Sequence, residues 1–313
     1  MDQPEFMELI FLWEECENLQ LPVSHLLLGS VATAAVANIK RVVSLGVLPV
    51  QVFNGGMIAM QIMRGEVDQR TKQRIEDSLV GAPMFMEQIC ENSCAEGFAM
   101  LMSSQVVGAW TAFESLTGDL WEAALNVCPK VLAKLSGVSR RIEKLAQGKP
   151  LPQLQGGSRE VDDKKVSLGD IEKFTRGTYD LRQNMGSMLR ARFNFSVLEE
   201  IRQAYSCAFA KRHDVIDAAL ADKAIDALNI VRNIIVHNNG IADDEYVQRL
   251  KSIPPAPPLK LGESLQLDGK IVKELIGPVI RRMAELITEV DLWVTTTEKQ
   301  DAERKDGSKT SIA

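Results

Sequence analysis

The sequence predicts an all-α fold, a helical bundle with long amphipathic helices and an additional N-terminal helical region. Three observations favour this fold class. Apolar residues recur every three to four positions over long segments, which is the period of a helix with one buried face. Alternation of apolar and polar residues, the pattern of a strand, is nearly absent, and residues 259–267 are its one candidate. Hydrophobic residues make up 45% and charged residues 25% of the 313 positions, a composition typical of a globular chain.

The first region, residues 1–92, is expected to be helical and carries no recognisable chemistry. Three of its segments have a helical pattern: 7–13, 31–43 and 67–79. Gly46, Pro49 and the Asn54-Gly55-Gly56 turn predict a break after the second segment, because glycine and proline interrupt helices. The apolar stretch 23–39 is about 17 residues long, whereas a membrane span needs about 20, so we interpret it as a buried helix.

The second region, residues 93–295, contains the strongest helical signals. Apolar side chains follow the helical spacing for about six turns in residues 98–120, and the pattern returns in residues 271–290. Two shorter segments share it: 197–209 and 221–237. Gly277-Pro278 falls inside the last long helix and predicts a kink there.

Polar or proline-rich segments separate these helices. Residues 149–165 are rich in proline, glycine and charge and are expected to form an exposed loop. Residues 167–170 resemble a capping box, which predicts a helix that ends near Asp180. The proline-rich residues 253–258 predict a stiff connector. Residues 296–313 are polar without an apolar period, so we expect a disordered tail.

The charge balance excludes a global attraction to nucleic acid. The chain has 36 Lys+Arg and 42 Asp+Glu, a net charge of −6, so any RNA contact must come from a local basic patch. Aromatic residues, at 5%, are too few to stack many bases. Candidate RNA-binding residues are Arg190, Arg192, Lys211 and Arg212, and Arg281-Arg282 is a further basic pair. Each of these groups is also compatible with a solvated helix face.

The cysteines and the N-terminal residues predict a cytoplasmic protein without a metal site. The chain has five cysteines, an odd number, and opens with an acidic rather than a basic segment, which indicates reduced thiols. Cys90 and Cys94 are four residues apart, but no second pair or nearby histidine completes a zinc set. We therefore expect the cysteines to be small buried side chains, and we expect no cofactor and no membrane association.

One helical segment, residues 221–237, places an arginine where apolar residues are expected. On a helical wheel Arg232 falls in the middle of the apolar face. The apolar residues around it are Ile225, Leu228, Ile235 and Val236. A buried guanidinium is costly unless it is paired, so this position predicts either a functional arginine or a structural ion pair.

The end of the same helix carries an asparagine and a histidine. Asn233 and His237 are four residues apart and share one edge of the wheel. Asn238-Asn239-Gly240 predicts a left-handed cap, which leaves His237 in the exposed last turn. Arginine can hold a phosphoryl group through two hydrogen bonds, and histidine exchanges a proton near neutral pH. The three side chains together suit phosphate chemistry, and a purely structural role for Arg232 in a helical adaptor is the alternative.

This motif resembles the signature of the HEPN superfamily, an arginine, a polar residue, three further residues and a histidine at the end of a helix in an all-α bundle. The matching residues are 232–237, followed by 238–240 and the acidic segment 243–246. The order of segments is similar too, because a long helix with Phe113-Glu114 precedes the motif and a long amphipathic helix follows it. The resemblance covers about two thirds of the chain and is nearest to bacterial HEPN-type proteins.

The resemblance implies RNA cleavage without a metal by a homodimer, since active HEPN proteins place two copies of the motif around one cleft. His237 would be the acid or base, Arg232 the phosphate clamp and Asn233 the residue that orients them. Glu114 would support Arg232 as its ion-pair partner, and Asp119 is equally permissible by sequence.

The expected function is therefore an endoribonuclease that leaves a 2′,3′-cyclic phosphate, acting as a toxin or defence effector under a protein antitoxin or regulator. HEPN proteins also include inactive modules that bind RNA or a protein partner, and this is the alternative function. His237→Ala is expected to abolish cleavage with the fold intact, and Arg232→Ala to cost stability as well.

Overall fold

The computed structural model describes residues 11–63, 93–129, 168–176, 183–209, 213–250, 253 and 256–309. These residues are 78% helical and contain no strand, which confirms the all-α prediction. The helices, in chain order, are α2 (Leu26–Met63), α5 (Ser93–Val127), α7 (Leu168–Thr175), α8 (Met185–Arg190), α9 (Leu198–Ala208), α10 (His213–Leu220), α11 (Lys223–Asn238), α12 (Asp244–Leu250) and α13 (Gly269–Lys309).

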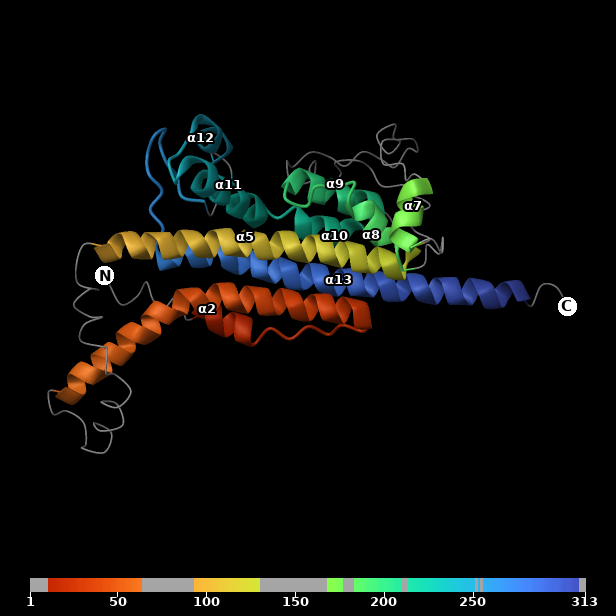
Figure 1. Ribbon diagram of the computed structural model, residues 1–313, viewed down its shortest axis with the longest axis horizontal. Helices are drawn as coiled ribbons and strands as arrows, with labels where there is room; N and C mark the ends of the chain where they lie inside the picture. The colour runs from red at the N-terminus through yellow and green to blue at the C-terminus, as the bar shows by residue number, and fades with distance from the viewer. Residues whose placement is uncertain are drawn as a thin grey trace.

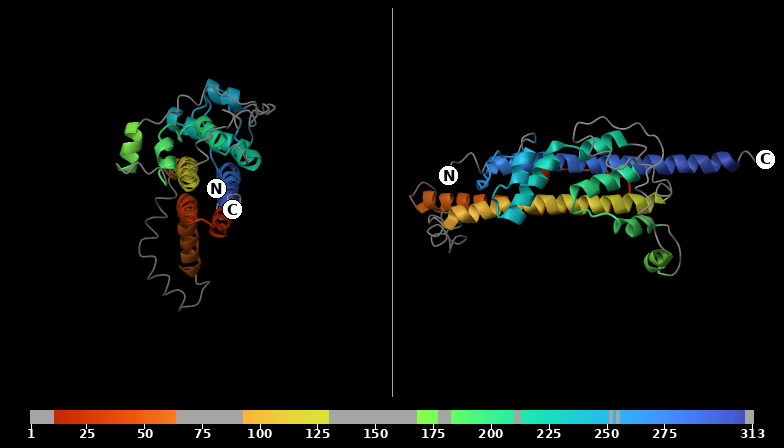
Figure 2. Two further views of the ribbon diagram at one scale, coloured as in Figure 1. Left: turned by 90° about the vertical axis from the view of Figure 1, so that its right-hand side faces the viewer. Right: turned by 90° about the horizontal axis from the view of Figure 1, so that it is seen from above.

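Helices α5, α13 and the first part of α2 lie side by side along the length of the molecule, and the second part of α2 bends away from the other two (Figure 1). Helices α5 and α13 run in the same direction and α2 in the opposite one. The shorter helices α8 to α12 cover the face of α5 and α13 that lies away from α2, which Figure 2 shows in two further views. Helix α11 contacts both α5 and α13, so the segment with the motif rests on two of the three long helices.

Helix α5 lies at the centre of the core because its apolar residues face several neighbours at once. Trp110, Phe113, Leu116, Leu120 and Trp121 are each at most 2% exposed. Burial of side chains of this size stabilises a fold by roughly 1.5–3 kcal/mol each. The Trp121 Nε1 also donates to the Ala204 carbonyl over 3.0 Å, which links α5 to α9. The predicted helices 98–120, 197–209 and 221–237 correspond to α5, α9 and α11.

Helix α2 joins the same core as the second region. Leu28, Ala32, Ala35, Ile39 and Val43 are buried and pack in one cluster with the apolar face of α5. The predicted helix 31–43 lies within α2. The interpretation of residues 23–39 as a buried helix holds only for the side that faces α5, because most of this stretch is exposed or partly exposed. Residues 28–43 of α2 consequently form part of one body with α5 and α13.

The predicted break at Gly46 and Pro49 is wrong, since α2 continues through both positions and through 54–56. The structure gives Gly46 a different role. It is buried, and a Cβ atom there would lie 1.3 Å from the Gln105 Nε2 of α5. Gly46 therefore permits close approach of two helices, and packing offsets its low helix propensity.

Two other expectations fail in the second half of the chain. Residues 259–267 form no strand, and Ser264 makes one isolated antiparallel bridge with Ile241. The tail expected to be disordered is helical, because α13 continues to Lys309 and passes through Pro278 on its way. Its hydroxyl groups follow the helix: Thr295, Thr296 and Thr297 each donate to the carbonyl four residues earlier. Residues 67–79 and 149–165 lie outside the described residues.

One segment among the described residues, Leu26–Gly46 of α2, is long and apolar enough to cross a membrane. A helix that packs in a soluble core meets the same test of length and composition. In this structure 28% of the apolar window is buried, the side that packs in the core, while Leu26, Leu27 and Leu45 are exposed.

Candidate functional site

The motif helix α11 has a cap at each end. The Asp222 carboxylate accepts a hydrogen bond from the Ala224 backbone N–H over 2.8 Å at the N-terminus. At the C-terminus Asn239 has φ 51° and ψ 36°, and Gly240 has φ 78°. The backbone N–H groups of both residues donate to the Ile234 carbonyl. The left-handed cap expected here is present, and it leaves the exposed His237 in the last turn of the helix, which ends at Asn238.

The buried face of α11 differs from the predicted one. Its centre lies near Val231, because Ala227, Leu228, Val231 and Ile234 are all buried. That centre is about 100° around the helix from Arg232. Val236, expected to be in the apolar face, is 47% exposed, and Arg232 is only partly buried. Arg232 therefore lies at the edge of the apolar face, since α11 packs into the angle between α5 and α13.

Arg232 contacts the neighbouring residue of the motif. Its Nη1 donates to the Asn233 Oδ1 over 3.0 Å, and its Nε is buried without a hydrogen-bond partner. Glu114 of α5 accepts a hydrogen bond from the Trp110 Nε1. Burial raises the pKa of the Glu114 carboxyl, while that hydrogen bond and the charge of Arg232 act in the opposite direction. Within the described residues Arg232 and Glu114 interact through their charges but form no ion pair.

Of the two carboxylates proposed for Arg232, the structure favours Glu114. Asp119 instead forms a salt bridge with Arg190, in which its carboxylate lies 2.7 Å from the Arg190 Nη1. This salt bridge joins α5 to α8. The Arg190 Nη1 also lies 2.7 Å from Glu122, and its guanidinium is 6.0 Å from the centre of the Phe195 ring. Two carboxylates thus neutralise the charge of Arg190.

The candidate RNA-binding residues do not form one surface with the motif in the described residues. Helix α8, which ends at Arg190, lies further along α5 than α11 and α12 do (Figure 1). Arg192 lies two residues after the end of α8. Lys211 and Arg212 lie outside the described residues. The remaining basic pair is neutralised, because Arg281 pairs with Glu15, and Arg282 pairs with Asp222 and Glu285.

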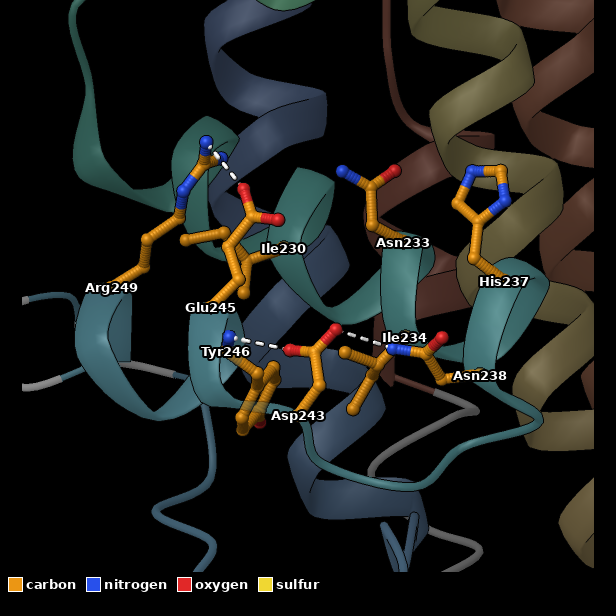
Figure 3. Close-up of a pocket in the computed structure, with 9 residues that line it drawn as sticks. All are labelled: Ile230, Asn233, Ile234, His237, Asn238, Asp243, Glu245, Tyr246 and Arg249. Carbon is orange, nitrogen blue, oxygen red and sulfur yellow. Dashed lines mark hydrogen bonds and ion pairs between the residues drawn. The ribbon is translucent and has the colours of Figure 1, made fainter. Parts of the chain in front are cut away.

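A pocket of about 220 Å³ opens beside the end of α11 (Figure 3). Its lining residues are Ile230, Asn233, Ile234, His237, Asn238, Asp243, Glu245, Tyr246 and Arg249. The side chains of Asn233 and His237 leave α11 in the same direction and form one wall of the pocket. Glu245 and Arg249 leave α12 and form the opposite wall. The structure therefore brings Asn233 and His237 together in one pocket, as the spacing indicates. Arg232 does not line it and lies behind Asn233, toward α5.

Asp243 forms the floor of this pocket and connects its two walls. One carboxylate oxygen accepts from the Asn238 side-chain amide, and the other accepts from the Tyr246 backbone N–H over 2.7 Å. The Tyr246 N–H, followed by the Asn238 amide, holds the pKa of the Asp243 carboxyl below its usual range. Asp243 thus ties the C-terminus of α11 to the first turn of α12.

The wall formed by α12 was not identified from the sequence. Arg249 lies 2.7 Å from Glu245, one turn earlier on the same helix, and both side chains are largely exposed. The Tyr246 hydroxyl donates to the Pro257 carbonyl over 2.8 Å, which anchors α12 from behind. Two signals exist in the sequence, namely an aspartate three positions before Tyr246, typical of a helix N-cap, and the i, i+4 spacing of Glu245 and Arg249.

The lining of the pocket includes one imidazole, two carboxylates and one guanidinium. In the part of the chain that the structure describes, no cluster of three or more His, Cys, Asp or Glu side chains could hold a metal ion. Cys16, Cys128 and Cys207 are buried and carry thiols rather than disulfides. Burial raises the pKa of the Cys16 thiol to about 12, so this group stays protonated and unreactive at neutral pH.

Comparison with known proteins finds no matching family model, no matching curated protein and no matching solved structure.

Proposed function

We propose that the protein is a metal-independent endoribonuclease of the HEPN type that acts as a homodimer. The observation that carries the proposal is the pocket at the end of α11, which exposes His237 beside Asn233, while Asn233 is hydrogen-bonded to Arg232. The three side chains are thus linked, although Arg232 and His237 leave the helix in different directions. In this proposal a substrate phosphate binds at Asn233, which lies between the side of the helix that carries Arg232 and the side that carries His237.

The chemistry of such a site is a transesterification. A base removes the proton from the ribose 2′-hydroxyl, whose oxygen forms a bond to the adjacent phosphorus. The bond between phosphorus and the 5′-oxygen breaks, and an acid gives that oxygen a proton. The products end in a 2′,3′-cyclic phosphate and a 5′-hydroxyl. Arg232 stabilises the negative charge that develops on the non-bridging oxygens.

The need for a base and an acid favours two copies of the chain. The pocket of one protomer contains a single imidazole, that of His237. Two protomers with their pockets at one cleft supply two imidazoles, one to accept and one to donate a proton. We propose that the homodimer is the active form, and that the growth inhibition expected of an unchecked ribonuclease is restrained by a protein antitoxin or regulator.

The test is incubation of the purified protein with total RNA in the presence of a chelator. We expect cleavage to persist, and the 3′ ends to carry a 2′,3′-cyclic phosphate. His237→Ala should abolish cleavage without loss of the fold, because His237 is an exposed side chain in the last turn of α11. His25→Ala is the matched control, since it removes an imidazole from the start of α2, where His25 lies 3.5 Å from Glu298.

The separation of Arg232 from the pocket favours one alternative, a module that binds RNA or a protein partner without cleaving RNA. In that case expression of the protein should leave growth unaffected. Loss of cleavage in chelator, or equal cleavage by wild type and His237→Ala, would refute the ribonuclease and leave this alternative.

A further inference from the structure

The wall of the pocket opposite His237 has a charge and a geometry that the proposed chemistry does not use. Arg249 of α12 lies on this wall, and Asn233 and His237 lie on the other side of the pocket (Figure 3). Among the described residues that line the pocket, it carries the permanent positive charge. Its partner Glu245 lies 2.7 Å away on the same helix. The side chain of Arg249 is 45% exposed and that of Glu245 is 67% exposed, so water reaches the pair from the pocket mouth.

The negative charges of the pocket differ in how strongly they are held. Both carboxylate oxygens of Asp243 accept hydrogen bonds, one from the Asn238 amide and one from the Tyr246 N–H, so Asp243 connects α11 to α12. Glu245 holds only Arg249 among its described partners. An ion pair this exposed contributes little to stability, so a phosphate can replace the Glu245 carboxylate on the guanidinium. A phosphate accepts two parallel hydrogen bonds from arginine as a carboxylate does.

The two walls are also held at a defined separation. Behind the pocket the Ala242 N–H donates to the Glu263 carbonyl over 2.9 Å, and the Leu265 N–H donates to the Gly240 carbonyl over 2.7 Å. The Tyr246 hydroxyl bonds to the Pro257 carbonyl. These bonds fix α12 relative to α11, so Arg249 meets a ligand of the pocket without rearrangement of the backbone.

We infer that Arg249 is a phosphate-binding residue for single-stranded RNA, which contacts the phosphate next to the one that is cleaved. In this inference one nucleotide of the strand enters the pocket of about 220 Å³, which lies between two helices whose ends are joined. Asn233 presents its amide nitrogen toward the Arg249 side of this space, where it can donate to the same nucleotide (Figure 3). The inference rests on the proposed ribonuclease function.

The experiment measures binding of a single-stranded RNA in which every ribose is 2′-O-methylated, so that no nucleophile is present. The dissociation constant is measured over a range of salt concentrations for wild type and Arg249→Ala. We expect Arg249→Ala to bind more weakly to all sequences, and the slope of log K against log salt to fall by about 0.7, the value for one phosphate contact of a single strand. Arg249→Lys should retain most of the slope, because it keeps the charge.

The matched control is Arg281→Ala. Arg281 lies 2.8 Å from Glu15 in an exposed ion pair of the same kind and does not line the pocket. Its removal changes the net charge by the same amount, so it should leave the salt slope unchanged. Glu245→Gln should tighten binding by releasing Arg249, and this gain should disappear in the double variant with Arg249→Ala.

The outcomes separate this inference from the proposed function. If wild type cleaves RNA through His237, but Arg249→Ala has the salt slope of Arg281→Ala, the phosphate contact is refuted and the ribonuclease stands. If the slope depends on Arg249 but natural RNA is not cut, the contact stands and the ribonuclease is refuted. If wild type does not bind the methylated RNA, the inference is refuted. Thermal unfolding of each variant should show that the fold is intact, because the substituted residues are exposed.

Discussion

Two residues of the motif, Arg232 and His237, leave α11 in different directions, because a spacing of five positions corresponds to about 140° around a helix. His237 faces the pocket and solvent, whereas Arg232 lies at the edge of the packed face near Glu114. Asn233 connects them, because it lines the pocket and accepts the hydrogen bond from Arg232. At the scale of single residues the motif therefore works as a linked series of side chains rather than as one cluster.

Arg232→Ala should abolish cleavage and change the free energy of unfolding by less than about 1 kcal/mol. The change is small because the guanidinium is only partly buried and its Nε already lacks a partner. This revises the larger cost expected from a position in the middle of the apolar face. Chemical denaturation measures the change, and Arg232→Lys should keep the stability while losing the two-point contact with phosphate. A loss of several kcal/mol would restore the interpretation of Arg232 as a core residue.

Glu114→Gln should make the protein less sensitive to pH in the acid range. Since the folded pKa of Glu114 is raised by burial, its contribution to stability is present below the ordinary glutamate pKa and is lost as the pH rises through the raised value. The amide keeps an acceptor for the Trp110 Nε1 but does not titrate. The difference in unfolding free energy, variant minus wild type, should therefore increase from pH 4 to pH 7. A difference that is flat or decreases over this range contradicts the raised pKa.

At the scale of elements, α11 is held in place by charged contacts with two neighbouring helices, α9 and α13. The buried Arg202 of α9 forms two hydrogen bonds of 2.9 Å with Asp226, and its Nε donates to the Leu220 carbonyl. The cap residue Asp222 also accepts from the Arg282 Nε of α13 over 2.6 Å. Through these contacts α9 and α13 set the position of α11, and hence of the pocket at its C-terminal end.

Asp226→Ala should destabilise the protein by about 3–5 kcal/mol, because it leaves the Arg202 charge buried without its partner. Denaturant unfolding measures the change. Arg281→Ala is the control, since it breaks an exposed pair with Glu15 and should cost less than about 1 kcal/mol. If the two variants lose equal stability, the pair between α9 and α11 is not the support that its burial indicates.

At the scale of the whole molecule, the described helices leave the motif at one end of the bundle. Helices α11 and α12 lie at one end of the face formed by α5 and α13, away from α2 (Figure 1). Val236 and Ile241 beside the motif are 47% and 46% exposed, which provides apolar area around the pocket. Such a position suits an isologous interface, in which the same surface of each protomer meets its copy.

Mixing wild type with His237→Ala should reveal whether the active site is composite. After subunits exchange at equal concentrations, about a quarter of the dimers contain two wild-type chains, so activity should fall to about a quarter of that of the same total protein. A monomeric enzyme would retain half. Light scattering should give twice the mass of one chain, and a monomer that cleaves RNA would refute the composite site.

The amino-acid sequence by itself determined the fold class, most of the long helices and the end of the motif helix. These features depend on local properties, namely the apolar period of α5 and α13 and the left-handed preference of Asn239-Gly240. The placement of Asn233 and His237 on one edge of α11 also follows from their i, i+4 spacing, because the geometry of a helix is regular.

Only the tertiary structure decided which face of α11 is buried, and therefore where Arg232 lies. Helix α11 packs on both α5 and α13, so the angle between these two helices sets which of its faces is buried. A helical wheel of α11 alone does not contain that angle. The same reason explains Gly46, whose meaning depends on Gln105 of α5, and Arg249, which reaches the pocket only because the turn after Asn238 folds α12 back beside α11. Contacts between residues distant in sequence carry this information, and local periodicity does not.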